Sequence, residues 1–412
     1  MLPFHSDRST NRVLRCAVTL LFLAAGLASS LRCEAAEKKP LKVFVLVGQS
    51  NMQGHAKIQT FEHIGMDPKT APMLKDMQNA DGTPRVFKDV WISYLSKDGV
   101  KKGNLTAGFG ADSTKIGPEL MFGITMQKRF GEPILIIKAA WGGKSLNTDF
   151  RPPSAGPYTF NKAQLEGLEK RGKDVKAIQT EKAKATGHYY RLTVEHVKNV
   201  LADISQVYPE YDAAQGYSLS GLVWFQGWND MVDGGTYTDR GNKGGYDDYS
   251  KVMEHFIRDI RKDLSAPKLP VVIGVLGVGG PTDQYGPDQQ RYKATHENFR
   301  EAMTAPAALP EFKGNVAAVR TENYWDMELN ALIARDNQVK KAAKKIQSSK
   351  KLDGKDAKAL LSDLRSKEFT KRELEILAKG ISNGGYHYLG SAKIMAGIGK
   401  GFADAMIELQ TQ

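Results

Sequence analysis

The feature that most constrains the fold is an apolar run at residues 43–47, followed directly by Gly-Gln-Ser-Asn-Met at residues 48–52. The run is rich in valine, which is typical of a strand buried on both faces of a parallel sheet. The glycine ends this strand, and Asn51 is suited to begin a helix after it. Because α/β proteins bind their ligands at the carboxyl ends of such strands, the Ser50 hydroxyl is expected at a ligand site. Ser50 is therefore a candidate nucleophile.

Four more apolar runs indicate buried strands, and segments with helical periodicity separate them. This alternation predicts a parallel sheet with helices on both faces. The expected strands lie at residues 43–47, 134–137, 222–225, 271–276 and 316–319. The expected helices lie at residues 118–130, 190–204, 249–264, 295–303 and 391–409.

One domain is expected from residue 40 to residue 412, with three insertions that depart from the strand and helix pattern. Residues 60–115 are loop-rich, and residues 148–187 are polar. Residues 337–379 are predicted to be a lysine-rich helical pair, interrupted by Asp-Gly at residues 353–354. Because proteins built on such sheets take their specificity from loops, the insertions are expected to shape the ligand cleft.

Residues 1–35 are predicted to be a secretory signal peptide. Three arginines precede an apolar stretch at residues 17–27, and the small residues Ala35 and Ala36 suit a cleavage site. The stretch is shorter than the roughly 20 residues that a membrane-spanning helix needs, so no stable membrane insertion is expected. Lipid modification of Cys33 is a minor alternative. It is weakened by Arg32, which directly precedes the cysteine. The protein is therefore expected to be secreted or periplasmic.

Both cysteines, Cys16 and Cys33, lie inside this leader, so the mature chain is expected to contain no thiol and no disulfide. Five histidines of the mature chain lie in helical or loop contexts without the spacing of metal ligands, and no metal or cofactor is expected. These histidines are His63, His188, His196, His255 and His296.

The formal net charge of the chain is +12, and much of this excess is local. Residues 340–379 hold eleven lysines and two arginines against six acidic residues. Such a segment suits an anionic polysaccharide, whereas nucleic-acid binding is not expected because the segment lacks aromatic residues interleaved with its lysines for base stacking. A solvated pair of helices with lysines on its outer face is the simpler interpretation.

A nucleophilic hydroxyl needs a general base and hydrogen-bond donors for the developing negative charge. Paired glycines at residues 142–143 follow the second expected strand and permit backbone amides to approach an oxyanion. Gln-Gly-Trp-Asn-Asp at residues 226–230 follows the third strand and offers side-chain amides. His387 precedes the last helix and is suited to act first as base and later as acid.

These motifs, in this order, resemble the SGNH hydrolase superfamily. The form of the first block, residues 48–52, is most similar to the sialate O-acetylesterase and acetylxylan esterase branch. The likeness extends in motif order over about residues 42–406, although the insertions match no known pattern. Each of the later motifs is a weak indicator alone, whereas the first block is fairly specific. The occurrence of three blocks in this order after successive strands argues against coincidence.

The resemblance implies a flavodoxin-like three-layer α/β/α sandwich with a five-stranded parallel sheet. It further implies that Ser50 attacks an ester carbonyl and that His387 takes the proton of the serine. The oxyanion hole would consist of the backbone amides of Ser50 and Gly143 and the side-chain amide of Asn229. In the carbohydrate-esterase branch Gln226 is expected to share or take over that donor role.

The chain departs from the family at the acidic residue. The family normally has Asp three residues before the catalytic His, and this chain has Gly384 there. The imidazole of His387 then depends on Asn383, on a backbone carbonyl, or on Glu322 or Asp326 from another loop. A weak or inactive enzyme is the remaining alternative.

The sequence therefore predicts a secreted carbohydrate O-acetylesterase that acts on an acetylated sugar through an acyl-serine intermediate. The alternative is a non-catalytic glycan-binding protein on a degenerate esterase fold. A lipid esterase is disfavoured because the sequence has no long apolar lid. His55 is expected in an exposed loop as a substrate contact, and Trp141 and Trp228 suit either a sugar face or the core.

Overall fold

The computed structural model describes residue 1 and residues 39–411. The signal peptide expected at residues 1–35 therefore lies outside the described residues, except for Met1. The chain divides into two units, of which one contains Met1–Pro40 with Ala213–Gly216 and the other contains Leu41–Asp212 with Tyr217–Gln412. The fold below is that of the second unit. In the described part of the chain, no helix has both the length and the hydrophobicity that a bilayer crossing requires.

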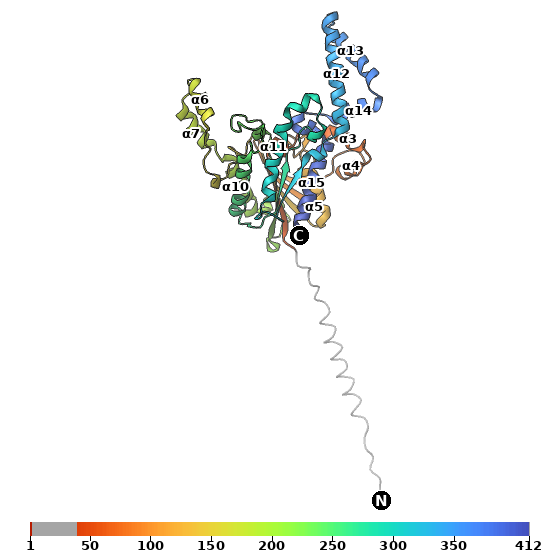
Figure 1. The fold of residues 1–412 in the computed structure, drawn as a ribbon. Coiled ribbons are helices and arrows are strands. Elements are labelled where there is room, and N and C mark those ends of the chain that lie inside the picture. The colour runs from red at the N-terminus through yellow and green to blue at the C-terminus, as the bar shows by residue number, and fades with distance from the viewer. Residues whose placement is uncertain (2–38, 412) are drawn as a thin grey trace. The chain divides into compact units, whose positions relative to one another are not determined.

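A seven-stranded sheet forms the centre of the fold, in the order β4-β3-β6-β1-β7-β8-β9 (Figure 1). Six strands are parallel, and only the edge strand β4 is antiparallel to its neighbour. The strands are β1 (Leu41–Gly48), β3 (Phe87–Ser96), β4 (Gly99–Leu105), β6 (Ile134–Ala140), β7 (Tyr217–Phe225), β8 (Val271–Val275) and β9 (Val316–Arg320). A separate two-stranded sheet consists of β2 (Ala56–Lys57) and β5 (Lys115–Ile116).

The predicted α/β sandwich is confirmed, but the sheet has seven strands rather than five. The five predicted strands are β1, β6, β7, β8 and β9, and their spatial order is the flavodoxin-like order. The two additional strands, β3 and β4, come from residues 60–115, which were expected to be loop-rich. The sequence conceals β4 because it is a polar edge strand, mostly exposed and containing two lysines.

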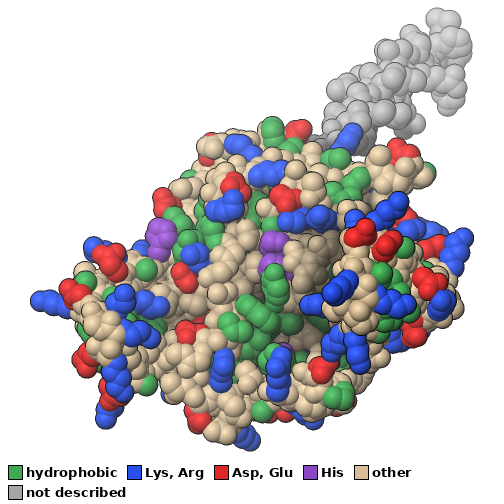
Figure 2. Space-filling model, turned by 90° about the horizontal axis from the view of Figure 1, so that it is seen from above, with side chains coloured by type: hydrophobic (Ala, Val, Ile, Leu, Met, Phe, Trp, Pro, Cys, Tyr) green, Lys and Arg blue, Asp and Glu red, His purple; other side chains and the backbone are tan. Residues whose placement is uncertain are grey.

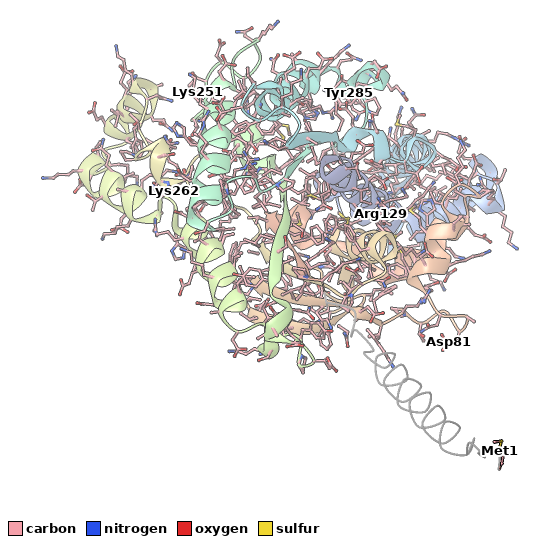
Figure 3. The ribbon with its side chains drawn as sticks, turned by 90° about the horizontal axis from the view of Figure 1, so that it is seen from below. Met1, Asp81, Arg129, Lys251, Lys262 and Tyr285 are labelled. Atoms are coloured by element: carbon pink, nitrogen blue, oxygen red, sulfur yellow. The ribbon has the colours of Figure 1, made fainter. Side chains whose placement is uncertain are left out.

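Helices cover both faces of the sheet. Figure 3 shows the molecule from below, with Arg129 of α5 and Lys262 of α10 on opposite sides of the sheet. One face is covered by α5 (Glu119–Phe130) and α15 (Ala392–Thr411). The other is covered by α8 (His188–Ala202), α10 (Asp247–Asp263) and α11 (Lys293–Thr304).

Strand β7 shows how the two halves of the core arise. Successive side chains of a strand point to opposite faces, so a strand buried on both sides is apolar throughout. Trp224 packs on Phe256 of α10 with ring centroids 4.4 Å apart, whereas Phe225 packs on Phe402 of α15 at 5.2 Å. The continuous apolar runs of the sequence therefore correspond to strands between two helical layers.

The remaining helices lie in the connections. Residues 148–187 contain α6 and α7, and residues 337–379 contain most of α12 together with α13 and α14. Figure 1 shows α12 and α13 extending away from the sheet. These shorter or peripheral helices are α2 (Ser50–Gln53), α3 (Phe61–Gly65), α4 (Ala71–Met77), α6 (Lys162–Lys170), α7 (Val175–Ala185), α9 (Trp228–Val232), α12 (Met327–Lys350), α13 (Gly354–Glu368) and α14 (Lys371–Gly380).

Candidate active site

A cavity of about 630 Å³ lies where β1, β6 and β7 end. Parallel strands end at one edge of the sheet, so the segments that follow these three strands meet there. The cavity is lined by Ser50 after β1, Gly143 after β6, Asn229 after β7, and His387 before α15. Figure 2 shows the molecule from above, with histidine side chains beside a group of hydrophobic ones near the centre of this face. The structure thus brings together four of the five predicted site residues.

Ser50 begins α2 directly after β1, and its side chain is nearly buried. Gly48 allows this close connection, because a Cβ atom there would lie 2.1 Å from the carbonyl oxygen of Phe225. The backbone N–H of Ser50 lies in the first turn of α2 and has no helical acceptor. Gly143 has a φ of 74°, which favours glycine. Within the described residues, neither the Ser50 nor the Gly143 N–H donates a hydrogen bond.

Gln49 organises the residues around the nucleophile, although the sequence analysis gave it no role. Its side-chain oxygen accepts hydrogen bonds from Gln226 Nε2 (3.1 Å), the Gly227 N–H (3.1 Å) and the Asn229 N–H (3.4 Å). Its Nε2 donates to Asn229 Oδ1 at 3.0 Å. Because the oxygen of Asn229 is held in this way, its Nδ2 hydrogens remain available to a ligand in the cavity.

Gln226 does not have the expected role. Its side chain is 1% exposed and does not line the cavity. Its Nε2 lies within hydrogen-bond distance of three acceptors, namely Gln49 Oε1 (3.1 Å), the Lys144 carbonyl (3.0 Å) and Asp230 Oδ2 (2.6 Å). An amide nitrogen has two hydrogens, so none remains for an oxyanion. In this structure Gln226 Nε2 is thus not free to act as the expected oxyanion donor, and the side chain instead supports Gln49.

Asp230 joins the loop after β6 to the loop after β7. Its buried carboxylate accepts hydrogen bonds from the N–H groups of Leu146 (2.8 Å) and Asn147 (3.0 Å), from Gln226 Nε2 and from the Tyr237 hydroxyl (3.2 Å). Burial raises the pKa of this carboxyl to about 6, against the hydrogen bonds that lower it. The loop that carries Gly143 is thereby held beside the helix that carries Asn229.

Asn383 faces the imidazole of His387. The Asn383 Oδ1 atom lies 3.1 Å from His387 Nδ1 and also accepts the Gly384 N–H at 2.7 Å. A backbone N–H only donates, so the Asn383 atom that faces both groups is its oxygen. His387 Nδ1 therefore carries a hydrogen and donates it to Asn383, which leaves Nε2 with a free lone pair. Burial, with a smaller contribution from Lys115, lowers the pKa of His387 to about 4.

The other suggested partners of the imidazole are engaged elsewhere. Glu322 forms an ion pair with Arg300, and Asp326 pairs with Lys393 at 2.9 Å and caps α12. Neither carboxylate lines the cavity. No backbone carbonyl of the described residues accepts a hydrogen bond from the imidazole. Of the alternatives drawn from the sequence, the structure therefore favours Asn383.

The backbone after His387 adopts an unusual conformation. Tyr388 and Leu389 have φ values of 51° and 60°, in the left-handed region that non-glycine residues rarely occupy. The fully buried Tyr388 hydroxyl accepts the Gly277 N–H at 2.8 Å and bonds to Thr321 at 2.6 Å. These contacts hold the strained segment and hence the position of its histidine.

His55 stacks on His387. The two ring centroids lie 3.9 Å apart with an interplanar angle of 2°. Burial, and then the charge that His387 acquires when protonated, lower the pKa of His55 to about 4. The side chain is half-buried in the cavity wall, not exposed in a loop as expected. In the sequence, only the closeness of His55 to Ser50 indicated that this histidine could belong to the site.

Ser50 and His387 line one cavity but make no direct hydrogen bond to each other. The nearest recorded partner of Ser50 Oγ is Gln49 Nε2, at 3.4 Å. Catalytic hydrogen bonds are often long without substrate and shorten in the complex. The Ser50 hydroxyl and the His387 imidazole thus face the same cavity without a hydrogen bond between them.

Two tryptophans complete the cavity wall. Trp141 is buried against Phe150 and Tyr189, whereas Trp228 is half-exposed beside Tyr386. Trp228 therefore offers a face to a ligand, and Trp141 mainly belongs to the core. Among residues 39–411, no group of three or more His, Cys, Asp or Glu side chains is arranged to hold a metal ion.

A known protein family matches most of the chain. Residues 40–324 match the family described as "Carbohydrate esterase, sialic acid-specific acetylesterase". The chain belongs to this family. The matched region includes Ser50, Gly143 and Asn229, whereas Asn383 and His387 lie beyond it. Membership in this family supports hydrolase and carbohydrate acetylesterase activity.

Two solved structures were also found. A protein from Arabidopsis thaliana has 16% sequence identity and a TM-score of 0.36, over 68% of this chain and 86% of its own. A carbohydrate acetylesterase from Xanthomonas citri has 14% identity and a TM-score of 0.37, over 67% of this chain. The match spans about half, 49%, of the Xanthomonas protein. No protein with a curated description matches the sequence.

Proposed function

We propose that this protein is a serine esterase that removes O-acetyl groups from a sugar or polysaccharide. Family membership supports esterase activity on carbohydrate. The observation that carries the serine mechanism is the shared cavity, in which the Ser50 hydroxyl, the neutral imidazole of His387 and the donors of Gly143 and Asn229 meet. The leader expected at residues 1–35 supports action outside the cytoplasm.

In the first half of the reaction, Ser50 Oγ attacks the ester carbonyl and His387 Nε2 takes its proton. The negative charge that develops on the carbonyl oxygen is stabilised by the N–H groups of Ser50 and Gly143 and by Asn229 Nδ2. The carbonyl then re-forms, the bond to the sugar oxygen breaks, and the imidazolium returns its proton to that oxygen. The products are the free sugar alcohol and acetyl-serine.

In the second half, His387 Nε2 takes a proton from water as the water oxygen attacks the acetyl-serine carbonyl. The same three donors stabilise the second oxyanion. Collapse breaks the bond to Ser50 Oγ, which recovers its proton from the imidazolium, and acetic acid leaves. Asn383 keeps the imidazole in the tautomer that both halves require.

The neutral partner affects how strongly His387 acts as a base. A carboxylate would stabilise the imidazolium, whereas the Asn383 amide orients the ring with little stabilisation of its charge. Burial lowers the pKa of His387 to about 4, so its neutral form is present at every pH above that value. We therefore infer an esterase of modest rate that retains activity in mildly acidic solution.

The cavity wall suits a polar ring. Trp228 and Tyr386 present partly exposed aromatic faces, and Lys97 and Lys144 contribute the charged groups. No carboxylate belongs to the described lining of the cavity. These features favour an acetylated sugar, including one that bears a carboxylate, over an acyl chain of a lipid.

A fluorophosphonate probe, which labels activated serines, tests the proposal most directly. We expect stoichiometric labelling at Ser50, a burst in the hydrolysis of an aryl acetate, and loss of both in Ser50→Ala. Ser366→Ala on the exposed α13 helix is the matched control and should retain both. A folded wild-type protein that is neither labelled nor hydrolyses aryl acetates and acetylated sugars would instead support the non-catalytic glycan-binding alternative.

A further inference from the structure

The lysine-rich insertion lies on the same side of the sheet as the cavity. Helix α12 begins after β9, at the carboxyl edge where the segments after β1, β6 and β7 form the site. Figure 1 shows α12 and α13 extending beyond this edge. We call residues 341–358, which include the end of α12 and the start of α13, the arm tip. The start of α12 and the cavity therefore share this edge of the sheet.

The arm tip carries unpaired positive charge. It contains seven exposed lysines and only two acidic residues, Asp353 and Asp356. The Asp353 carboxylate is used as the cap of α13, where it accepts the N–H groups of Lys355 and Asp356. None of the seven lysines forms an ion pair with another described residue. They are Lys341, Lys344, Lys345, Lys350, Lys351, Lys355 and Lys358.

At the base of the same insertion, by contrast, most of the cations are paired. The buried Asp336 carboxylate accepts from both Lys340 and Arg365, and Lys379 pairs with Glu62. The further pairs are Arg335 with Glu368 and Glu373, Lys367 with Asp363, and Arg372 with Glu328. Acidic partners thus neutralise most of the cations at the base, while the excess charge is concentrated at the arm tip.

We propose that the arm tip binds an anionic polysaccharide, one that bears carboxylate or sulfate groups along its chain. Lys341 and Lys345 are four residues apart on α12 and lie on one side of the helix, as a repeating polyanion requires. The arm tip has no aromatic residue, so it lacks the side chains that stack on bases or enter a membrane interface. The family acts on carbohydrate, which favours a glycan as the polyanion.

This binding goes beyond the proposed function because it needs neither Ser50 nor His387. Its consequence is that the enzyme would be retained on an acidic polymer while the cavity removes acetyl groups from it. Attraction between exposed charges weakens with salt, so the binding is expected to be strongest at low ionic strength.

The test measures binding in the Ser50→Ala background, where no turnover occurs. The probes are fluorescent polygalacturonate and chondroitin sulfate, with dextran as the neutral control, at about 50 mM salt where screening is incomplete. Replacing Lys341, Lys344 and Lys345 by Gln should weaken binding about tenfold, since each exposed contact is worth a few-fold. The matched control replaces Lys170, Lys173 and Lys176, which are exposed lysines on or beside α6 and α7, and should change binding less than twofold.

Both triple variants lose the same net charge, so the comparison separates a local site from general attraction. Equal weakening in the two variants, or no binding of either acidic polymer by the parent, would overturn the proposal. Tighter binding of duplex DNA or of phosphatidylserine vesicles at the same salt would also overturn it. Replacing Lys355 and Lys358 on α13 is an independent second variant and should also weaken binding. Absence of esterase activity would bear on the proposed function alone.

Discussion

The two sides of the candidate site are supported in different ways. On the nucleophile side, Gln49, Gln226 and Asp230 form a buried hydrogen-bonded network that joins the ends of β1, β6 and β7. On the base side, the imidazole ring of His387 contacts one amide oxygen, that of Asn383, and the stacked ring of His55, while Tyr388 anchors the backbone. The first side is built into the sheet, whereas the second is a half-buried segment beside α15.

A buried ion pair strengthens the nucleophile side further. Lys138 of β6 and Glu119 of α5 are both fully buried, with Nζ and Oε2 2.7 Å apart. Lys138 also donates to the carbonyls of Gln53 (2.9 Å) and Phe109 (2.8 Å), so it holds the last residue of α2. Burial lowers the pKa of Lys138 and raises that of Glu119, while their mutual attraction opposes both shifts.

This difference indicates that the position of the nucleophile and the ionisation of the histidine base are controlled by separate contacts. A change in the buried network leaves several polar groups without partners, so it affects stability and geometry together. A change beside His387 alters one contact and hence mainly the orientation and pKa of the imidazole. The predictions below test this division.

The largest effect is expected when either reacting group is removed. Ser50→Ala and His387→Ala should each lower kcat for an aryl acetate by about 10⁴-fold or more, because the two groups act in one step. The double variant should lose little more than either single variant. Steady-state kinetics of the three proteins provide the measurement. Additive losses would show that the two sides of the site do not cooperate.

The next largest effect is expected at Gln49. Gln49→Glu would place a carboxylate oxygen against Asn229 Oδ1, now 3.0 Å from Gln49 Nε2, and turn the Asn229 amide away from the cavity. Loss of one oxyanion donor should lower kcat by about 10²- to 10³-fold with the fold retained. Kinetics and circular dichroism provide the measurements.

Gln49→Ala is the control for stability at the same position. It would leave the N–H groups of Gly227 and Asn229 without an acceptor and should reduce the free energy of unfolding by about 2 kcal/mol or more. Urea unfolding measures this change. Unchanged kcat in Gln49→Glu would remove Asn229 from the proposed oxyanion hole.

A smaller change with a different signature is expected at Asn383. Asn383→Asp keeps an oxygen facing His387 Nδ1, adds a negative charge and raises the pKa of the histidine. In the parent, the base is neutral above a pKa of about 4, so kcat/KM should fall only as the pH drops through that value. In Asn383→Asp the same decline should occur at higher pH, and kcat should rise several-fold because the imidazolium is better stabilised.

Asn383→Leu provides the opposite control, since it removes the oxygen with little change in volume. We expect kcat to fall about 10- to 100-fold as the tautomer and orientation of His387 are lost. pH profiles of the parent and both variants make the comparison. If kcat/KM of Asn383→Asp declined at the same acidic pH as that of the parent, the contact between residue 383 and His387 would be contradicted.

The smallest effect is expected at His55. His55→Ala should lower kcat by a few-fold with little change in KM, because the ring that restrains His387 is lost while the substrate contacts remain. His55→Phe retains a flat ring and should restore most of the loss. Equal defects in both variants would indicate that the imidazole nitrogen of His55, rather than its stacking face, is required.

The sequence analysis found five strands because most of them are buried on both faces and so appear as continuous apolar runs. It missed β4 because this edge strand is polar and mostly exposed, and it missed β3, the neighbour of β4, because polar side chains interrupt its apolar residues. The meeting of Ser50, Gly143 and Asn229 was predictable, since parallel strands end at one edge. The grouping of these residues depends on topology more than on side-chain detail.

The sequence by itself determined which local segments form strands, and which strand ends carry a hydroxyl, paired glycines and an amide, because periodicity and composition are local properties. Only the tertiary structure decided that Gln226 is an internal support, that Asn383 faces His387, and that His55 stacks on the same ring. These relations depend on the distances between side chains from distant segments of the chain. Such distances are set by packing, which no local pattern of residues records.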